Sequence, residues 1–431
     1  MRMSFVRLVC YFALNLVSTR AVSLDAISNP FMNSRAFDRK PSCNAYIDTI
    51  SVLLLQVRLD KQTGQPLVRQ RDLRVSFFPE RKEVLGKFDR PETRMLYTLG
   101  EKGAPIVYLW NGLGSSANSS YSNFLMDQLN ALGMTVVTIP STFNENDSIG
   151  FSSHVRPGLS SADVPDLLRL TESAEKEVIR RHDLKPSSRI LMGVSMGAFQ
   201  AGALLSRKEW EPRFDKYILI NPPLDLRYGI HILDQMVDGT KSLSEARKQE
   251  IENLRSEFFS NSDLKESPNE FRSEVGRRQL GERELGYLIG ASMRGSVQGA
   301  TLASQKVKND GVLKRRTSFG KSQEVRKWSI YDYFEKVALP FHSNFFKKQG
   351  LNLDLDREMT LIPHLRESPR PRNVLVLHSM DDFISNPAEI EKLRQIPIHS
   401  VITSCGGHVG ALAYSLYQEP LREFLIRDLK N

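Results

Sequence analysis

A serine placed between two glycines is the residue in this sequence most suited to chemistry. It is Ser195 in the motif GVSMG, which follows the apolar run Arg189–Val194 and precedes a stretch of small residues. Glycines two positions before and two after a serine permit a sharp strand-to-helix turn, which leaves the serine oxygen exposed at the edge of a sheet. Ser195 is therefore a candidate nucleophile. The backbone N–H of Met196 is a candidate donor to the oxyanion that forms during acyl transfer.

A serine nucleophile needs a base, which in this setting comes late in the chain. Of the eight histidines, His408 is the best placed, because it follows Cys405-Gly406-Gly407 in a glycine-rich loop between a predicted strand and the last predicted helix. Loop residues on a rigid scaffold often carry chemistry. His399 falls at the edge of a predicted strand, where a structural role is the simpler interpretation. We therefore expect His408 to be the base.

The base in turn needs an acid that orients it. The acid is expected after the apolar run VLVL, where the chain reads HSMDDFIS from His378 to Ser385. Either aspartate of the adjacent pair could serve. We prefer Asp382, with Asp381 next and Asp225 third. One member of the pair is also suited to capping a turn or helix.

The glycine-rich loop Asn111–Ser116 follows the apolar run IVYLW and can supply a second oxyanion donor. Glycines allow a close backbone approach, and the N–H of Leu113 is the expected donor. Phosphate binding is the competing interpretation of this loop, but the sequence has neither GxxxxGK[ST] nor GxGxxG. It also has no CxxC and no His/Cys cluster with metal-ligand spacing, so we expect no metal and no cofactor.

Short apolar runs alternate with segments of helical periodicity along most of the chain. This alternation predicts βαβ units, a mostly parallel sheet and the α/β class. An initial hairpin precedes the buried strands. The predicted strands are Ile50–Leu59, Leu73–Phe78, Arg94–Leu99, Ile106–Trp110, Met134–Ile139, Arg189–Val194, Tyr217–Ile220, Val374–Leu377 and Ser400–Ile402.

A long segment without buried-strand patterns interrupts this alternation. Within it, Lys241–Phe259 and the aromatic-rich Ile330–Lys348 have helical spacing. We predict a helical cap or lid over residues 229–368, with its aromatic helix facing the Ser195 opening, between two parts of a core at 24–228 and 369–431. Residues 306–327 carry eight basic and two acidic residues. They indicate either a solvated or disordered linker, or a patch that contacts anionic lipid or another polyanion.

The first 23 residues have the three-part pattern of a secretory signal peptide. Arg2 and Arg7 precede the apolar run LVCYFALNLV, and small residues follow around Ala21. We therefore expect export to the periplasm or outside the cell. Removal of this segment leaves Cys43 and Cys405, and the sequence leaves open whether they form a disulfide. An exported chain favours the bond, but in the usual sheet layout the last strand lies far from the first.

The composition of the 431 residues excludes several classes of protein. Apolar residues make up 40% and charged residues 25%, which are values of a globular chain rather than of a disordered or multi-span membrane protein. The formal charge of +9 is spread along the sequence, with three arginines in the first 23 residues. This surplus is too small to indicate a nucleic-acid partner.

The motifs GVSMG, HSMDDFIS and CGGHVG resemble, in order and spacing, those of the α/β-hydrolase superfamily of serine esterases, lipases and acyl-peptidases. The resemblance covers about residues 49–228 and 371–431. It implies an eight-stranded, mostly parallel sheet with helices on both faces, a Ser195-His408-Asp382 triad, and oxyanion donors at Leu113 and Met196. Family members usually have His-Gly where this chain has Asn111-Gly112. The segment after the sixth sheet strand matches the place where members of the family carry lids.

These features predict a serine hydrolase that cleaves a carboxylic ester through an acyl-enzyme. The ester would be lipid-like if the aromatic cap lines the pocket. Thioester or amide cleavage and acyl transfer use the same triad and remain open. A hydrolase-fold protein that only binds, or that serves as a scaffold through its insertion, is the alternative from another class. The expected partner is a small-molecule or lipid ester; the oligomeric state is left open.

Overall fold

The computed structural model describes residues 41–52, 66–85, 91–207, 213–240, 243–260 and 275–427. The predicted signal peptide and residues 53–59 of the predicted first strand lie outside these ranges. Within them, no helix combines the length and apolarity needed to cross a membrane.

Eight strands form one sheet in the order β1-β2-β4-β3-β5-β6-β7-β8. β1 and β2 pair antiparallel, β2 pairs antiparallel with β4, and the remaining pairs are parallel. The predicted α/β fold with an eight-stranded, mostly parallel sheet is thus confirmed. The strands are β1 (Arg71–Val75), β2 (Thr93–Thr98), β3 (Ile106–Trp110), β4 (Thr135–Ile139), β5 (Arg189–Val194), β6 (Lys216–Ile220), β7 (Val374–Ser379) and β8 (His399–Thr403).

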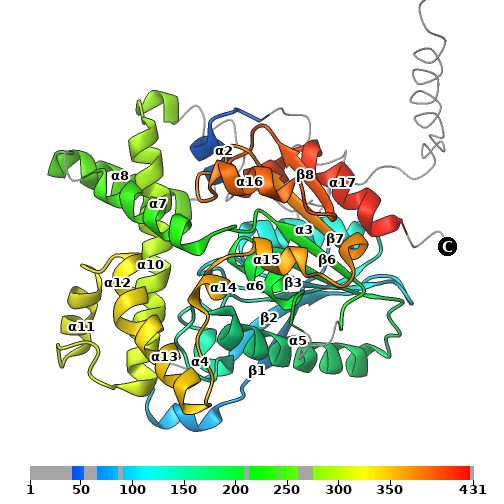
Figure 1. Cartoon of the computed structure of the whole chain (residues 1–431), viewed down its shortest axis with the longest axis horizontal. Helices are drawn as coiled ribbons and strands as arrows, with labels where there is room; N and C mark the ends of the chain where they lie inside the picture. The colour runs from blue at the N-terminus through cyan, green and yellow to red at the C-terminus, as the bar shows by residue number, and fades with distance from the viewer. Residues whose placement is uncertain are drawn as a thin grey trace, which may run out of the picture.

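Helices cover both faces of this sheet (Figure 1). Side chains alternate along a strand, so neighbouring residues of β3 enter different cores. Tyr108 and Trp110 pack in one core with residues of α5 and α6, while Val107 and Leu109 pack in the other with residues of α3 and α17. This burial on both faces explains why the central strands read as continuous apolar runs. The helices are α3 (Ser120–Ala131), α4 (Ser148–Phe151), α5 (Ser160–His182), α6 (Met196–Leu204), α16 (Pro387–Leu393) and α17 (Ser415–Ile426), and a 3₁₀ turn spans Pro79–Glu83.

The start of the predicted first strand is wrong, because residues 45–51 form helix α2 (Ala45–Ser51). The side chain of Asn44 caps this helix by accepting hydrogen bonds from the N–H groups of Tyr46 and Ile47. The hydroxyls of Thr49 and Ser51 donate to backbone carbonyls one turn earlier, at 2.6 and 2.7 Å. The N-cap formed by Asn44 favours a helix here, although Ile50 and Val52 have high β propensity.

The described residues between β6 and β7 form the cap. Figure 1 shows its helices α7, α8 and α10–α13 gathered at one side of the sheet. Glycine permits close packing there: a Cβ at Gly290 of α10 would lie 2.8 Å from the carbonyl oxygen of Leu233 in α7. The cap contains α7 (Leu226–Asp238), α8 (Glu245–Ser260), α10 (Glu282–Lys308), α11 (Ser318–Val325), α12 (Ile330–Tyr333), a π-helical turn (Phe334–Ala338), α13 (Leu339–Lys348), α14 (Leu355–Met359) and α15 (Ile362–Arg366).

The basic segment 306–327 is folded, so the interpretation as a disordered linker is wrong. It comprises the end of α10, a loop and α11, and it buries Leu313 and Val325. Arg156 also forms an ion pair with Asp310 in this segment. Apolar anchors within a charged stretch therefore determine its structure, while most of its basic side chains remain on the surface.

Candidate active site

The serine motif forms the expected turn between β5 and α6. Ser195 has φ 53° and ψ −120°, a backbone conformation that residues other than glycine rarely adopt. A Cβ at Gly193 would lie 2.5 Å from the Cα of Ala198, and one at Gly197 would lie 2.2 Å from the carbonyl oxygen of Trp110. Both glycines are thus required for the chain to turn this tightly against β3. The turn presents the Ser195 hydroxyl at the carboxyl edge of the sheet.

The structure brings Ser195, His408 and Asp382 into one hydrogen-bonded chain. His408 Nε2 lies 2.8 Å from Ser195 Oγ, and His408 Nδ1 lies 3.0 Å from Asp382 Oδ2. A carboxylate can only accept, so Nδ1 carries the ring proton and Nε2 is left to accept from the serine hydroxyl. The three residues come from loops after β5, β7 and β8, whose carboxyl ends meet at one edge of the sheet.

Asp382 is buried but well provided with donors. Its oxygens accept hydrogen bonds from His408, from the Asn221 side chain at 2.9 Å, and from the Ile384 N–H at 3.2 Å. Burial acts to raise the pKa of Asp382, but the interactions with His408, His378 and Asn221 outweigh it, and the pKa lies below its usual range. The carboxylate is therefore ionised at neutral pH, as an acid that orients the histidine must be.

The alternative acids have other partners. Asp381 accepts from the N–H groups of Gly407 and Gly406, at 2.8 and 3.2 Å, and so holds the loop that carries His408. Burial raises the pKa of Asp381, and these two bonds partly offset it. Asp225 caps helix α7 by accepting from two backbone N–H groups. Neither of these aspartates has a hydrogen bond to His408.

Two other histidines, His378 and His399, have contacts that indicate a structural rather than a catalytic role. His378 lies on β7 and is fully buried. Its Nε2 lies 3.9 Å from Asp382 Oδ2 and 3.2 Å from the carbonyl oxygen of Pro222. His399 packs on the ring of Phe424 at the far edge of the sheet and contacts Arg427. Neither has a contact with Ser195.

The loop expected to supply an oxyanion donor lies against Ser195. A Cβ at Gly112 would be 3.1 Å from the Ser195 Cβ, a tight contact that glycine avoids. The Gly112 N–H donates to the hydroxyl of Tyr121 at 2.9 Å, which fixes the start of the loop. Leu113 and Met196 line the same cavity as Ser195 and His408. That their N–H groups bind an oxyanion stays a prediction.

Two connected spaces open at Ser195. The inner cavity, of about 90 Å³, lies beneath the cap. Of the described residues that line it, Ser195, His408 and Tyr333 have polar side chains and the others are apolar. Its apolar lining comes largely from the cap: Leu226, Gly229, Ile230 and Leu233 of α7, Ile289, Met293 and Val297 of α10, and Ile330, Phe334 and Met359.

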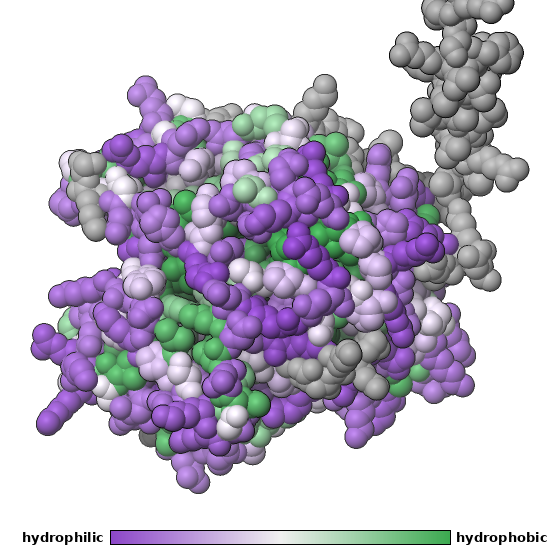
Figure 2. Space-filling view, viewed as in Figure 1, coloured by the Kyte–Doolittle hydropathy of each residue, from purple (hydrophilic) through white to green (hydrophobic). Residues whose placement is uncertain are grey.

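The outer cleft is larger, at about 640 Å³, and more polar. It runs between the Gly112 loop, residues 143–146 and α10, and among the described residues of its lining Glu145 is the one carboxylate. In Figure 2, hydrophobic residues show on this largely hydrophilic face where the cap meets the rest of the protein. The aromatic part of the cap contributes unevenly: Tyr333 and Phe334 line the inner cavity, but Tyr331 and Phe345 are exposed. The predicted aromatic segment therefore faces the site at Tyr333 and Phe334, but not at Tyr331 and Phe345.

The structure adds residues that the sequence did not indicate. Asn221 follows β6, donates to Asp382 and also reaches the carbonyl oxygen of Gly407 at 3.3 Å. A polar residue directly after a buried strand was the available signal. Thr49 of α2 accepts a hydrogen bond from the His408 N–H at 2.8 Å. Nothing in the sequence pointed to it, because its surroundings read as the start of a strand.

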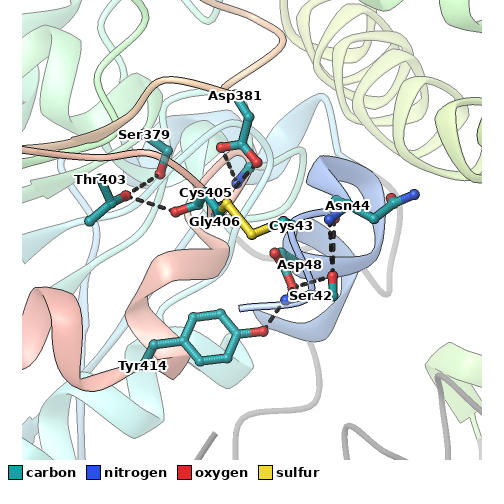
Figure 3. The surroundings of a disulfide bond; sticks show 11 residues. Ser42, Cys43, Asn44, Asp48, Ser379, Asp381, Thr403, Cys405, Gly406 and Tyr414 are labelled. Carbon is teal, nitrogen blue, oxygen red and sulfur yellow. Dashed lines mark hydrogen bonds between the residues drawn. A yellow bond between two sulfur atoms is a disulfide. The ribbon is translucent and has the colours of Figure 1, made fainter. Parts of the chain in front are cut away.

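Cys43 and Cys405 form a disulfide, which answers the question that the sequence left open. The argument from sheet layout fails because Cys43 precedes a helix rather than a strand, and this helix lies beside the loop after β8 (Figure 3). As for metals, the described part of the chain contains no group of three or more His, Cys, Asp or Glu side chains that could hold an ion.

No family model matches the sequence, and no curated protein matches it. Solved structures that resemble the fold include an acylaminoacyl peptidase of Pyrococcus horikoshii, with 12% identity and a TM-score of 0.43; the match covers 84% of this chain and 42% of the peptidase. An esterase of Pyrococcus furiosus has 13% identity and a TM-score of 0.40, and the match covers 86% of this chain and 98% of the esterase. Brefeldin A esterase, a bacterial homologue of human hormone-sensitive lipase, has 14% identity and a TM-score of 0.39. That match covers 92% of this chain and 86% of the esterase. The chain thus spans less than half the length of the peptidase.

The fold assignment follows from the structure itself. An eight-stranded sheet in this order carries a serine turn after its fifth strand, and the acid and the histidine follow the seventh and eighth strands. Serine, acid and histidine in this chain order, with the serine on a strained strand-to-helix turn, define one architecture among the known serine triads. The chain therefore has the α/β-hydrolase fold.

Proposed function

We propose that this protein is a serine hydrolase that cleaves carboxylic esters through an acyl-enzyme. The observation that carries the proposal is the hydrogen-bonded chain from Asp382 through His408 to Ser195, at distances of 3.0 and 2.8 Å. A backbone loop suited to an oxyanion and an apolar cavity adjoin the same serine. A protein that only binds a ligand has no need for this combination of groups.

The proposed reaction has two halves. Ser195 Oγ attacks the ester carbonyl carbon while His408 Nε2 takes the hydroxyl proton, and Asp382 stabilises the imidazolium that forms. The N–H groups of Leu113 and Met196 bind the oxyanion, and His408 then gives its proton to the leaving alcohol. Water attacks the acyl-enzyme in the second half, with His408 again as the base. The acid product leaves and Ser195 regains its proton.

The two spaces at Ser195 support a particular kind of ester. The inner cavity offers an apolar surface beneath the cap, which suits a hydrocarbon portion of the substrate. The outer cleft offers hydroxyl and amide groups together with the carboxylate of Glu145. Its lining favours a neutral or cationic polar portion over an anionic one. We propose an amphipathic, lipid-like ester on these grounds.

A panel of esters tests this proposal. Chain length and leaving group are varied separately on the non-reduced protein, and thioester and amide analogues are included. Turnover that rises with an apolar chain and vanishes in Ser195→Ala is the expected result. If a folded protein hydrolyses none of the panel and does not react with a fluorophosphonate, the protein is a binding protein on a hydrolase fold.

We also propose export to an oxidising compartment. The disulfide between Cys43 and Cys405 supports it, because such bonds persist outside the cytosol and are rare within it. Mass spectrometry of the protein from its native source, alkylated without reductant, is the test. Two alkylated thiols in place of the bond would contradict export. Contact of the basic segment 306–327 with anionic membranes also stays a proposal, which sedimentation with anionic against neutral vesicles tests.

A further inference from the structure

Helix α2 lies directly against the loop that carries His408. A Cβ at Gly407 would lie 2.1 Å from the carbonyl oxygen of Ala45, and one at Gly410 would lie 2.2 Å from that of Asp48. Glycine at both positions therefore allows the histidine loop to rest on the backbone of the helix. Gly407 also has φ +57°, which disfavours any side chain there.

Thr49 is the residue of α2 that bonds to His408. Its Oγ accepts the His408 N–H at 2.8 Å and donates to the carbonyl oxygen of Ala45 at 2.6 Å. Both groups are buried, so the His408 N–H would lack a described partner without this hydroxyl. Thr49 thus fixes the backbone of His408, while Asp382 fixes its ring.

Three further contacts hold α2 in place. Cys43, just before the helix, is bonded to Cys405, three residues before His408 (Figure 3). Asp48 accepts from the hydroxyl of Tyr414, which follows the histidine loop, at 2.8 Å. Tyr46 stacks on Phe383, with ring centroids 5.2 Å apart. The helix therefore contacts the loop of the base and the loop of the acid, and the disulfide links it covalently to the loop of the base.

We propose that Thr49 positions His408 for catalysis, and that the Cys43–Cys405 disulfide keeps the helix carrying Thr49 in place, so that activity depends on the oxidised state of this bond. Cys43 is exposed and Cys405 is half-buried, so a small dithiol can reach the bond. Reduction transfers two electrons and two protons from the dithiol, breaks the S–S bond and leaves two thiols, while the dithiol itself becomes a disulfide. The inference rests on the proposed hydrolase function for its activity readout.

The first test replaces Thr49 in the oxidised protein. Thr49→Val keeps the shape but removes the acceptor, and kcat should fall roughly 5- to 100-fold. Thr49 also lines the outer cleft, so kcat and not KM is the criterion. Thr49→Ser keeps the hydroxyl and should restore kcat. Ser51→Ala is the matched control, because Ser51 makes the same kind of bond to Ile47 within α2 but none to His408. If Thr49→Val keeps the wild-type kcat, or if Thr49→Ser falls equally, Thr49 does not position the histidine.

The second test reduces the bond. Treatment of the wild type with dithiothreitol should lower kcat roughly tenfold or more, and reoxidation should restore it. A Cys43→Ala/Cys405→Ala variant should have the lowered kcat from the start and should not respond to the dithiol. A fully reduced protein, with two free thiols by mass, that keeps the wild-type kcat would overturn the redox dependence. If reduction also unfolds the sheet, the Thr49 series still decides the positioning role.

Hydrogen exchange separates a failure of this inference from a failure of the proposed function. Reduction should speed exchange in residues 404–414, but leave the β5 segment 189–194 unchanged, whether or not the protein turns over an ester. Faster exchange without any hydrolysis would leave the coupling intact and reject the enzyme. Normal hydrolysis with unchanged exchange and unchanged kcat would reject the coupling and leave the enzyme.

Discussion

Asp381 and Asp382 are adjacent, and replacing each by asparagine gives a matched pair of variants. Asp382 accepts from three donors, on His408, Asn221 and Ile384. An asparagine has one acceptor oxygen, and its NH₂ group can only donate. When this group faces His408 Nδ1, the ring proton moves to Nε2, and the ring can no longer accept the serine proton. The expected loss in kcat for Asp382→Asn is roughly 10⁴-fold. KM should change little, because the side chain does not line either space at Ser195.

Asp381→Asn should act on stability instead. Asp381 binds the N–H groups of Gly406 and Gly407, and an amide oxygen can keep one of these bonds. The N–H group left without an acceptor should cost about 1–3 kcal/mol of unfolding free energy and less than about tenfold in kcat. Steady-state kinetics with a soluble ester and urea unfolding curves measure the two quantities. Equal losses in kcat, or a greater loss in Asp381→Asn, would refute the assignment of Asp382 as the acid.

Three other predictions have defined expected outcomes. His408→Ala should lower kcat by several orders of magnitude, whereas His399→Ala should retain wild-type kinetics; similar kinetics for both would contradict the geometry. Gly229→Phe should fill the inner cavity, because a Cβ there would meet only Ile384 at ordinary distances, so activity should fall more for long-chain esters than for acetates. A uniform loss across chain lengths would argue against this cavity as the apolar subsite. Burial raises the pKa of Asp147 to about 6, so the folded state binds more protons than the unfolded state between about pH 4 and 6, and stability should fall as the pH rises through this window. Asp147→Asn should remove this fall, worth about 3 kcal/mol, in urea unfolding at pH 4 to 8, and an unchanged pH dependence would contradict it.

The sequence predicted the sheet well because its central strands are buried on both faces. Ile106–Trp110 and Arg189–Val194 are continuous apolar runs that end in glycine-containing turns, and both strands have these bounds in the structure. The turn at Ser195 was predictable because its glycines, at fixed spacing around the serine, form a motif within five residues. Burial and tight turns constrain the residue types within a short stretch of sequence, so sequence patterns predict these features well.

What the sequence could not predict depends on contacts between distant segments. The helical start of the N-terminal arm follows from capping by Asn44 and from packing against the loop after β8, although its residues read as a strand. The disulfide and the Thr49 bond join positions about 360 residues apart, so no local pattern reports them. The aromatic residues 330–348 share helical spacing, yet their exposure depends on which neighbours the cap helices provide.

The central claim is that Ser195 is an activated nucleophile, and covalent labelling tests it most directly. The oxidised protein is treated with a fluorophosphonate, digested, and mapped by mass spectrometry, with Ser195→Ala and heat-unfolded wild type as controls. The account predicts a single phosphonyl adduct, on Ser195, in the folded wild type and in neither control. A folded protein that remains unlabelled, or that carries its adduct on another serine, would contradict the account.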